Sequence, residues 1–386
     1  MNVLEYRPQY LKLPDSVVKL KTFKEKNFVG IQELENFADK NKIVFPILTN
    51  EYFLSLINKD DKNDPLRALI LPTIEELESY VDFQDAKKGF LDTSGEATNV
   101  KTPGLQHKYS PTALALVSNV CAGLCRECFR KRLFIEGKSV KNETTFPNEE
   151  ALAYLKEHKE INAILLTGGD SLMLKDESIS NILELLNEES LSHITTIRFG
   201  TKIQSFFPQR ITKELCQLFV DFEKRSGKKV YICTHFEHAN ELSKESIASL
   251  GLTHSFGIAQ YNQTVLLKGI NDDVDVLYDL FQKLALHGVR PYYLFQCRPV
   301  IGSLPMQLTL KEGIVIYANL MKKMTGVHKP RYAMSTPIGK IEILGVHPSD
   351  KNIILLKLHS SKTKESTGDI LLYDVSKHNP CWYDMS

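Results

Sequence analysis

The chain has 386 residues, of which 42% are hydrophobic and 25% are charged, as in an ordinary soluble globular protein. Its formal charge of +1 provides no overall field to attract nucleic acid or an anionic membrane, so we expect neither partner. No apolar run is long enough to cross a bilayer, and Met1–Arg7 lack the apolar core of a secretory signal. Seven cysteines in a chain of this length do not suggest a disulfide framework. We therefore expect a cytoplasmic protein.

Residues 1–105 are predicted to form a polar, helical region. Apolar residues recur at helical spacing in Gly30–Lys40, Asn50–Ile57 and Thr73–Tyr80. Gly89–Pro103 is predicted to be an irregular connection between these helices and the rest of the chain.

From Ala113 onward, short apolar or β-branched runs alternate with longer amphipathic segments. The predicted strands are Ala113–Val120, Ala163–Thr167, Thr195–Gly200, Lys229–Thr234, Ser255–Gln260 and Pro291–Gln296. The predicted helices between them are Asn148–His158, Glu177–Asn187, Thr212–Ser226, Lys244–Leu250 and Asp272–Leu286. This alternation predicts an α/β fold, a parallel sheet with helices on its outer face. Six units favour a partial (β/α)6 barrel over residues 106–300, with catalytic residues after the strand ends.

Residues 301–386 make up the third predicted part of the chain. Tyr317–Met324 has helical spacing, and Lys329–Ile343, Asn352–Leu358 and a polar tail come after it. We expect this C-terminal extension to close the open barrel.

Three cysteines, Cys121, Cys125 and Cys128, lie directly after an apolar run with the spacing C-x3-C-x2-C. Three thiolates on one short loop can hold three irons of a [4Fe–4S] cluster and leave the fourth without a protein ligand. Such an open coordination position is where metal chemistry occurs. A zinc site is the alternative, but no second cysteine pair has zinc-ribbon spacing, and His107 precedes the loop. The remaining cysteines are expected to be small buried residues: Cys216, Cys233, Cys297 and Cys381.

The cysteine spacing resembles that of the radical S-adenosylmethionine enzymes. The resemblance implies that the open iron binds S-adenosylmethionine, and that one electron, from a donor such as flavodoxin or ferredoxin, cleaves it to a 5′-deoxyadenosyl radical. Gly168, Gly169 and Asp170 lie after a predicted strand, where those enzymes have a Gly-Gly-acid segment that contacts the amino group of S-adenosylmethionine. A tight turn capped by Asp170 is the alternative explanation, and both can hold together.

Longer collinear matches narrow the resemblance to the lysine 2,3-aminomutase family, from about Phe45 to Gly345. The matching segments are Tyr52–Ile57, Asn63–Arg67, Pro103–Tyr109, Cys125–Arg132, Phe199–Lys202, Pro208–Thr212, Thr234–His238, Asn262–Asn271 and Arg290–Cys297. Several long matches in one order are more specific than a single motif. The resemblance implies a small amino-acid substrate bound to pyridoxal phosphate, loss of its β-hydrogen to the adenosyl radical, and migration of nitrogen from C2 to C3. It also implies a homo-oligomer.

The resemblance assigns roles to individual residues. Lys340 matches the lysine that holds pyridoxal phosphate, with a solvated surface amine as the alternative. Arg130 matches the arginine that pairs with the substrate α-carboxylate, for which a planar guanidinium is suited. Lys108 and Tyr109 match residues of the pyridoxal site. Three residues at predicted strand ends would surround S-adenosylmethionine and the cofactor, or else make buried structural hydrogen bonds: His235, Asn262 and Gln263.

The chain departs from the family pattern in four places. Arg298 replaces an aspartate that reaches the distal ammonium in lysine-acting members, and Tyr332–Thr336 lacks a second expected acid. An arginine of the cofactor site is replaced near Thr112, and the glycine-rich approach to the lysine is reduced to Ile338-Gly339. A desolvated cation repels an ammonium and attracts a carboxylate, so we expect a substrate other than lysine, with glutamate as the first guess. Two alternatives stay open: a radical enzyme without pyridoxal phosphate, and a non-enzymatic iron–sulfur carrier.

Overall fold

The computed structural model describes residues 6, 8–13, 15–43, 45–85, 92, 95–131, 145–363 and 365–384. Its main feature is one sheet of 12 strands in the order β14-β13-β12-β11-β10-β9-β8-β7-β6-β5-β4-β3. Their bounds are β3 Val100–Thr102, β4 Leu105–Tyr109, β5 Thr112–Ser118, β6 Ala163–Gly168, β7 Thr196–Thr201, β8 Lys229–Thr234, β9 Ala259–Leu266, β10 Val289–Gln296, β11 Arg331–Thr336, β12 Gly339–Val346, β13 Ile353–Ser361 and β14 Ile370–Asp374. A separate pair joins β1 (Ser16–Val17) to β2 (Thr49–Asn50).

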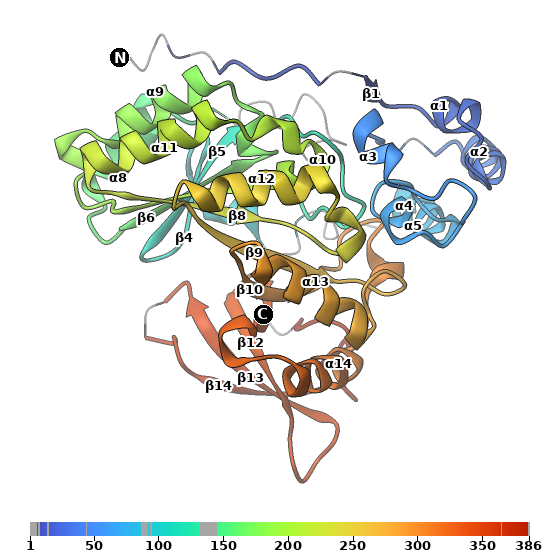
Figure 1. Cartoon of the computed structure of the whole chain (residues 1–386). Helices are drawn as coiled ribbons and strands as arrows, with labels where there is room; N and C mark the ends of the chain where they lie inside the picture. Colours follow the sequence, from blue (N-terminus) through green and yellow to red (C-terminus); the bar gives the residue numbers. More distant parts are fainter. Residues whose placement is uncertain are drawn as a thin grey trace.

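Strands β5 to β11 pair parallel with one another, whereas β3, β4 and β5 at one end of the sheet and β11 to β14 at the other pair antiparallel. Helices connect the parallel strands and cover the outer face of the sheet (Figure 1). They are α8 (Glu149–Glu157), α9 (Asp176–Leu186), α11 (Lys213–Ser226), α12 (Lys244–Ser255), α13 (Val274–Leu286) and α14 (Leu310–Lys323), with the short α10 (Ile203–Phe206) after β7. A parallel sheet is therefore confirmed, and with it the α/β class.

The inner face of the sheet is hollow. Along β9, side chains alternate strictly between buried and half-buried. The buried ones face the covering helices, because successive side chains of a strand point to opposite faces. The sheet also curls, since the Lys108 ammonium of β4 donates to the Thr336 carbonyl of β11. The half-buried side chains of β5 to β12 therefore face a shared interior.

The predicted strand at Ser255–Gln260 is wrong. Ser255 is the last residue of α12, and β9 begins only at Ala259. Gly257 ends the helix with φ 74°, a left-handed conformation that suits glycine, and its N–H donates to the His254 carbonyl at 2.9 Å. The other predicted strands coincide with β5, β6, β7, β8 and β10 to within a few residues.

The C-terminal extension contributes to the sheet itself. The segment Lys329–Ile343 contains β11, parallel to β10, and β12, which returns antiparallel to it. Trp382, near the end of the tail that was expected to be polar, is buried.

The N-terminal region is helical, as predicted. Its helices are α1 (Leu20–Glu25), α2 (Ile31–Lys40), α3 (Glu51–Ser55), α4 (Pro65–Ala68) and α5 (Ile74–Asp85), with α6 (Glu96–Asn99) after them. Part of the connection predicted at Gly89–Pro103 lies outside the described residues, and the rest holds α6 and β3. Figure 1 shows α1 to α5 together at one side of the sheet.

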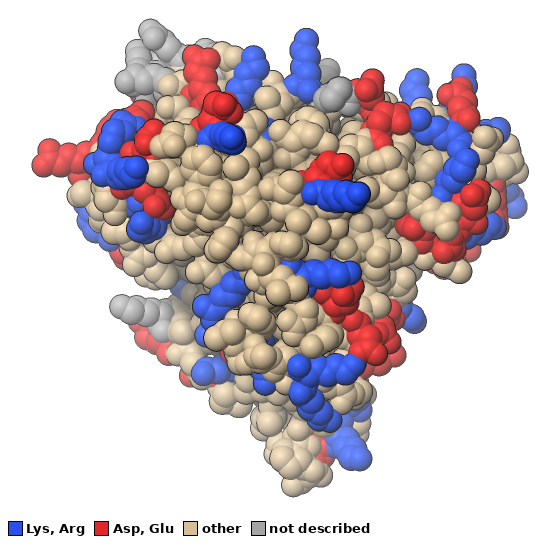
Figure 2. All heavy atoms as spheres, in the orientation of Figure 1, with Lys and Arg blue, Asp and Glu red and all other residues tan. Residues whose placement is uncertain are grey.

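The surface has no single-sign patch on the face shown in Figure 2, where basic and acidic side chains are interspersed. Among the helices of the described residues, none is both long and apolar enough to traverse a bilayer.

Candidate active site

The cysteine loop comes directly after β5, and the glycine pair at the end of β6 packs against its start. Gly168 has φ 120°, and a Cβ there would lie 2.2 Å from the Ser118 carbonyl oxygen. A Cβ on Gly169 would lie 2.6 Å from the Val120 oxygen. The N–H groups of Gly169 and Asp170 donate to the Ser118 and Val120 carbonyls at 2.6 and 2.8 Å. Glycine is needed here because two main chains meet, which brings the Gly-Gly-Asp segment beside the first cysteine.

The Asp170 side chain is buried and makes three hydrogen bonds within the protein. Its carboxylate accepts from the Leu172 N–H at 2.9 Å, the Thr201 hydroxyl at 2.7 Å and the Lys202 N–H at 2.7 Å. The capping explanation for Asp170 is therefore confirmed, and contact with a ligand stays a prediction.

The three thiols of the cysteine loop are half-buried and free of disulfides. Burial raises the pKa of each, and nearby Asp170 and Glu127 raise the pKa of Cys121 and Cys125 further. Thiolates in this place need the positive charge of a metal.

The donor set of the loop fits an iron–sulfur cluster. Cys121, Cys125 and Cys128 are three free thiols on one short loop, and thiolate is the usual ligand of such clusters. Elsewhere in the described residues, His107, His158 and Glu160 have their three ligand atoms within 4.8 Å of one another.

The N-terminal region holds the cysteine loop in place. The Leu124 and Arg126 N–H groups donate to the Leu48 and Leu69 carbonyls at 2.7 and 2.9 Å. Buried Glu76 of α5 pairs with Arg126, whose Nε lies 3.0 Å from Glu76 Oε2, and with Lys131, whose Nζ lies 3.3 Å from Oε1. Burial raises the pKa of Glu76, but Arg126 and Lys131 outweigh it and keep the pKa below its ordinary value. One carboxylate thus pairs with two cations that flank Cys128 in the sequence.

We expect Glu76→Gln to lower the free energy of unfolding by about 3–5 kcal/mol, because two buried cations lose their partner. Glu33→Gln is the matched control, since Glu33 pairs with Lys62 at 3.1 Å but both side chains are exposed. That change should cost less than about 1 kcal/mol. Denaturant unfolding measures both variants, and equal effects would contradict the assigned role of Glu76.

Two arginines predicted from distant segments meet beside the cysteine loop. The guanidinium carbons of Arg130 and Arg298 lie 4.6 and 3.8 Å from the ring centre of Phe129. Arg130 also pairs with Glu96 of α6 at 3.0 Å and donates to the Thr167 hydroxyl at 3.0 Å. Burial lowers the pKa of Arg298 below its ordinary value, and Glu96 offsets only part of this change. The pair between Arg130 and Glu96 is buried and is therefore no surface ion pair.

Lys340 lies inside the curled sheet. Its ammonium nitrogen is 4.2 Å from the ring centre of Tyr293, and it neighbours Ser335 in the register of β11 and β12. Burial lowers the pKa of Lys340 to about 7, with Arg198 and Arg298 contributing. Burial likewise lowers the pKa of Lys108 to about 7. Lys340 is thus no solvated surface amine, and at neutral pH a large fraction of it is an uncharged nucleophile.

The remaining predicted residues divide between the two faces of the sheet. Tyr109 is largely buried, and burial raises its pKa. Gln263 faces the interior. His235 comes directly after β8, and burial lowers its pKa to about 3, which keeps the imidazole neutral. Asn262 faces outward, accepts from the Phe236 N–H at 2.9 Å and donates to the Phe236 carbonyl and the Thr264 hydroxyl. The alternative of buried structural hydrogen bonds is thus confirmed for Asn262, and contact with a cofactor stays a prediction.

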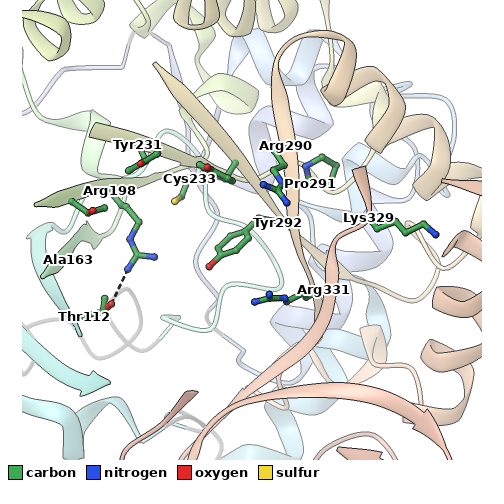
Figure 3. A pocket seen from close by; sticks show the side chains of 12 residues that line it. Thr112, Ala163, Arg198, Tyr231, Cys233, Arg290, Pro291, Tyr292, Lys329 and Arg331 are labelled. Carbon is green, nitrogen blue, oxygen red and sulfur yellow. Dashed lines mark hydrogen bonds between the residues drawn. The ribbon is translucent and has the colours of Figure 1, made fainter. Parts of the chain in front are cut away.

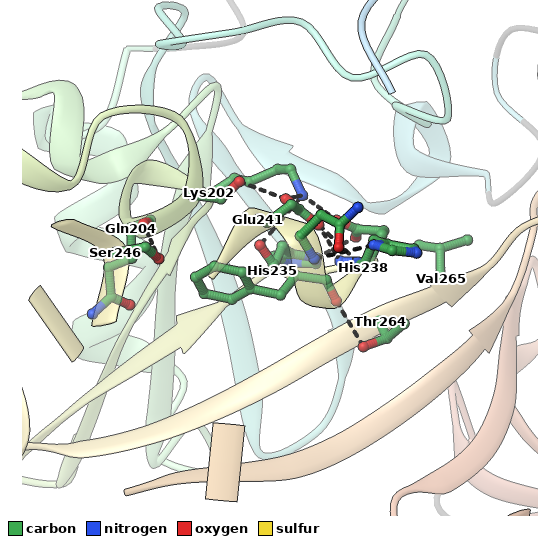
Figure 4. A network of polar contacts seen from close by, with 12 residues as sticks. Lys202, Gln204, His235, His238, Glu241, Ser246, Thr264 and Val265 are labelled. Atoms are coloured by element: carbon green, nitrogen blue, oxygen red, sulfur yellow. Dashed lines mark hydrogen bonds and ion pairs between the residues drawn. The ribbon is translucent and has the colours of Figure 1, made fainter. Parts of the chain in front are cut away.

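A buried polar network that the sequence did not reveal lies next to the cysteine loop (Figure 4). The Lys202 ammonium pairs with Glu237 and, at 2.7 Å, with Glu241. Burial lowers the pKa of Lys202, but the two carboxylates outweigh it and raise the pKa well above the ordinary value. The network thus holds the Lys202 ammonium near the loop, where it lowers the pKa of Cys125 while Glu237 raises it.

A cavity of about 470 Å³ opens at the N-terminal ends of the strands, opposite the cysteine loop (Figure 3). Its lining includes basic and aromatic side chains: Arg198, Arg290, Lys329, Arg331, Tyr231, Tyr261 and Tyr292. No residue predicted as a site residue lines it.

No family model matches the chain. A putative L-lysine 2,3-aminomutase from Aquifex aeolicus is 39% identical, over 95% of this chain and 94% of its own length. The L-lysine 2,3-aminomutase of Clostridium subterminale is 32% identical over 80% of this chain and 70% of its own. The glutamate 2,3-aminomutase of Clostridioides difficile is 35% identical over 75% and 64%.

A solved radical SAM methyltransferase from Sphaerobacter thermophilus is 16% identical and covers 48% of this chain and 57% of its own, with a TM-score of 0.35. That likeness is too low to support an argument. The curated relatives are similar over most of the chain at more than 30% identity. The chain therefore belongs to the lysine 2,3-aminomutase family, whose members are radical S-adenosylmethionine isomerases.

Proposed function

We propose that this protein is a 2,3-aminomutase that acts on an α-amino acid with a carboxylate side chain, glutamate being the first candidate. Its cofactors are a [4Fe–4S] cluster, S-adenosylmethionine and pyridoxal phosphate. An electron donor such as flavodoxin or ferredoxin supplies the cluster with its electron. The strands around residues 106–300 form the partial barrel, and residues 301–386 close it.

The cysteine loop fits the cluster. Cys121, Cys125 and Cys128 are free of disulfides, half-buried and close together on one loop. The Gly168-Gly169 segment lies against the loop, so the main chain there can bind S-adenosylmethionine beside the iron that lacks a protein ligand.

The interior of the sheet fits pyridoxal phosphate. Lys340 is buried, its pKa is lowered to about 7, and it stands between the cysteine loop and the basic cavity. Tyr109 and Gln263 face the same interior. When bound, the cofactor stabilises an unpaired electron on the migrating group; the protein binds, orients and excludes water.

The observation that carries the substrate assignment is the meeting of Arg130 and Arg298 at one aromatic ring, that of Phe129. Arg130 holds the α-carboxylate, and Arg298 holds the side-chain carboxylate. The Glu96 carboxylate beside both shows that an anion is stable in this position. A lysine substrate would instead bring an ammonium close to two guanidinium groups, which costs several kcal/mol in a desolvated pocket.

Incubation of the anaerobic, cluster-loaded enzyme with glutamate or lysine tests the assignment. We expect a β-amino acid from glutamate, and we expect Arg298→Asp to reduce that turnover by at least about 100-fold because a charged partner is lost and reversed. Mass spectrometry measures the product. Arg298→Lys is the control that keeps the charge and should retain part of the activity. Faster turnover of lysine than of glutamate by the unaltered enzyme would overturn the assignment.

A further inference from the structure

The cavity at the N-terminal ends of the strands is built for an anion. Its described lining contains three arginines and one lysine, and no acid. In Figure 3, Arg198 and Arg331 point into the cavity from opposite sides, with Tyr292 between them, whereas Lys329 points away. Two guanidinium groups that converge without a carboxylate repel each other, so a bound anion would stabilise the arrangement.

The guanidinium of Arg198, on β7, has donors that the described protein groups do not fully use. Its Nη2 lies 3.5 Å from the Thr112 hydroxyl, a long contact. Its Nε is buried and, within the described part of the chain, has no hydrogen-bond partner. The Arg198 guanidinium is therefore incompletely hydrogen-bonded within the protein.

The cavity is connected to Lys340 through two tyrosine rings. The Lys340 ammonium is 4.2 Å from the ring centre of Tyr293, and that ring is 4.1 Å from the ring of Tyr292, which lines the cavity. Arg331 is the β11 partner of Tyr293 in the sheet register. A group attached at Lys340 therefore extends into the cavity on the side away from the cysteine loop.

We propose that Arg198 and Arg331, with the Thr112 hydroxyl, bind the phosphate of pyridoxal phosphate in this cavity. The proposal rests on the proposed function. Arg198 is the principal ligand, since its guanidinium lines the cavity and its Nη2 makes only the long contact with Thr112. Arg331 is the second, and the His359 ring, with Nε2 at 3.0 Å from Arg331 Nη1, holds it in place.

Equilibrium binding of pyridoxal phosphate and of pyridoxal to cofactor-depleted full-length protein separates the phosphate from the ring. We expect Arg198→Met to weaken pyridoxal phosphate binding by about 10- to 100-fold. Binding of pyridoxal, which lacks the phosphate, should fall much less, because Arg198 affects it only through its contribution to the lowered pKa of Lys340. Arg225→Met is the matched control, because Arg225 is exposed on α11 and pairs with Glu184 away from the cavity. It should change neither affinity.

A second variant distinguishes the loss of a phosphate ligand from a general loss of structure. Because Thr112 and Arg198 are in contact, a guanidinium placed at position 112 can reach the same space. Thr112→Arg added to Arg198→Met should restore much of the pyridoxal phosphate affinity. Equal losses for both ligands, or no loss for either, would overturn the phosphate assignment and leave the proposed function standing. Unaltered protein that binds neither ligand would overturn both.

Discussion

The Cys125→Ala variant is expected to form no 5′-deoxyadenosine above the uncatalysed background. Cys125 is one of three thiols on the loop after β5, and each is needed to hold one iron. Its pKa is raised by burial and by Glu127, so the thiolate exists here only when a metal compensates its charge. With two ligands left, the cluster should be lost and with it the source of the radical.

Iron and sulfide per chain, and deoxyadenosine formed after reduction, measure the effect in anaerobically purified protein. Cys216→Ala is the matched control, because Cys216 is equally a thiol of the protein but is buried in the core on α11. That variant should retain its iron and the cleavage reaction. A Cys125→Ala protein with full iron content, or an unaltered protein containing one zinc per chain, would contradict the cluster assignment.

The parts of the site that depend on adjacent residues could be predicted from the sequence. The spacing of the three cysteines, the glycine pair after β6 and the position of Arg130 are local features, and the structure brings them together. Arg298 came from a distant segment, but its place after β10 put it at the same edge of the sheet, because the carboxyl ends of parallel strands share one edge.

The error in the predicted bounds of β9 changes the expected orientation of Asn262. A strand expected at Ser255–Gln260 would have ended before Asn262 and left it in a loop. Strand β9 instead continues to Leu266, so Asn262 lies in mid-strand. Because side chains alternate along the strand, the Asn262 side chain points outward, toward the covering helices. In a strand, a shift of one residue moves a side chain to the opposite face.

Contacts between distant segments could not be predicted. Glu76 pairs with Arg126 and Lys131 across 50 and 55 residues, and nothing in its helical surroundings distinguishes it from an exposed glutamate. The basic cavity likewise gathers Arg198 and Arg331 from strands more than a hundred residues apart. The first group arises from packing of α5 against the cysteine loop and the second from the curl of the sheet, and no local pattern specifies either.

Lys340→Ala should abolish covalent attachment of pyridoxal phosphate, and in the unaltered protein the attachment should rise with pH through about 7. Burial lowers the pKa of Lys340 to about 7, with Arg198 and Arg298 adding to the effect. Below that pH the amine is protonated and cannot attack a carbonyl; above it the free amine is available. An ordinary lysine, with a pKa near 10.4, would be almost fully protonated over the same range.

The lowered pKa of Lys340 also makes the stability of the folded protein depend on pH. Between about pH 7 and the unfolded value of about 10.4, the unfolded chain binds a proton at Lys340 that the folded chain does not. The contribution of Lys340 to stability therefore increases as pH rises across this window. Lys340→Ala should therefore make the free energy of unfolding rise less steeply with pH across this window. Denaturant unfolding at several pH values, in the absence of the cofactor, measures this slope.

Borohydride reduction and then peptide mass spectrometry locate the attached lysine. Lys322→Ala, in an exposed position on α14, is the control and should leave the labelling of Lys340 intact. Labelling elsewhere in the chain that is unchanged in Lys340→Ala would place the cofactor on another amine. A protein that takes no label at any lysine yet cleaves S-adenosylmethionine would instead be a radical enzyme that works without pyridoxal phosphate. In that case the lowered pKa of Lys340 would have to serve the substrate itself, because a buried amine among arginines is costly to retain without a partner that uses it.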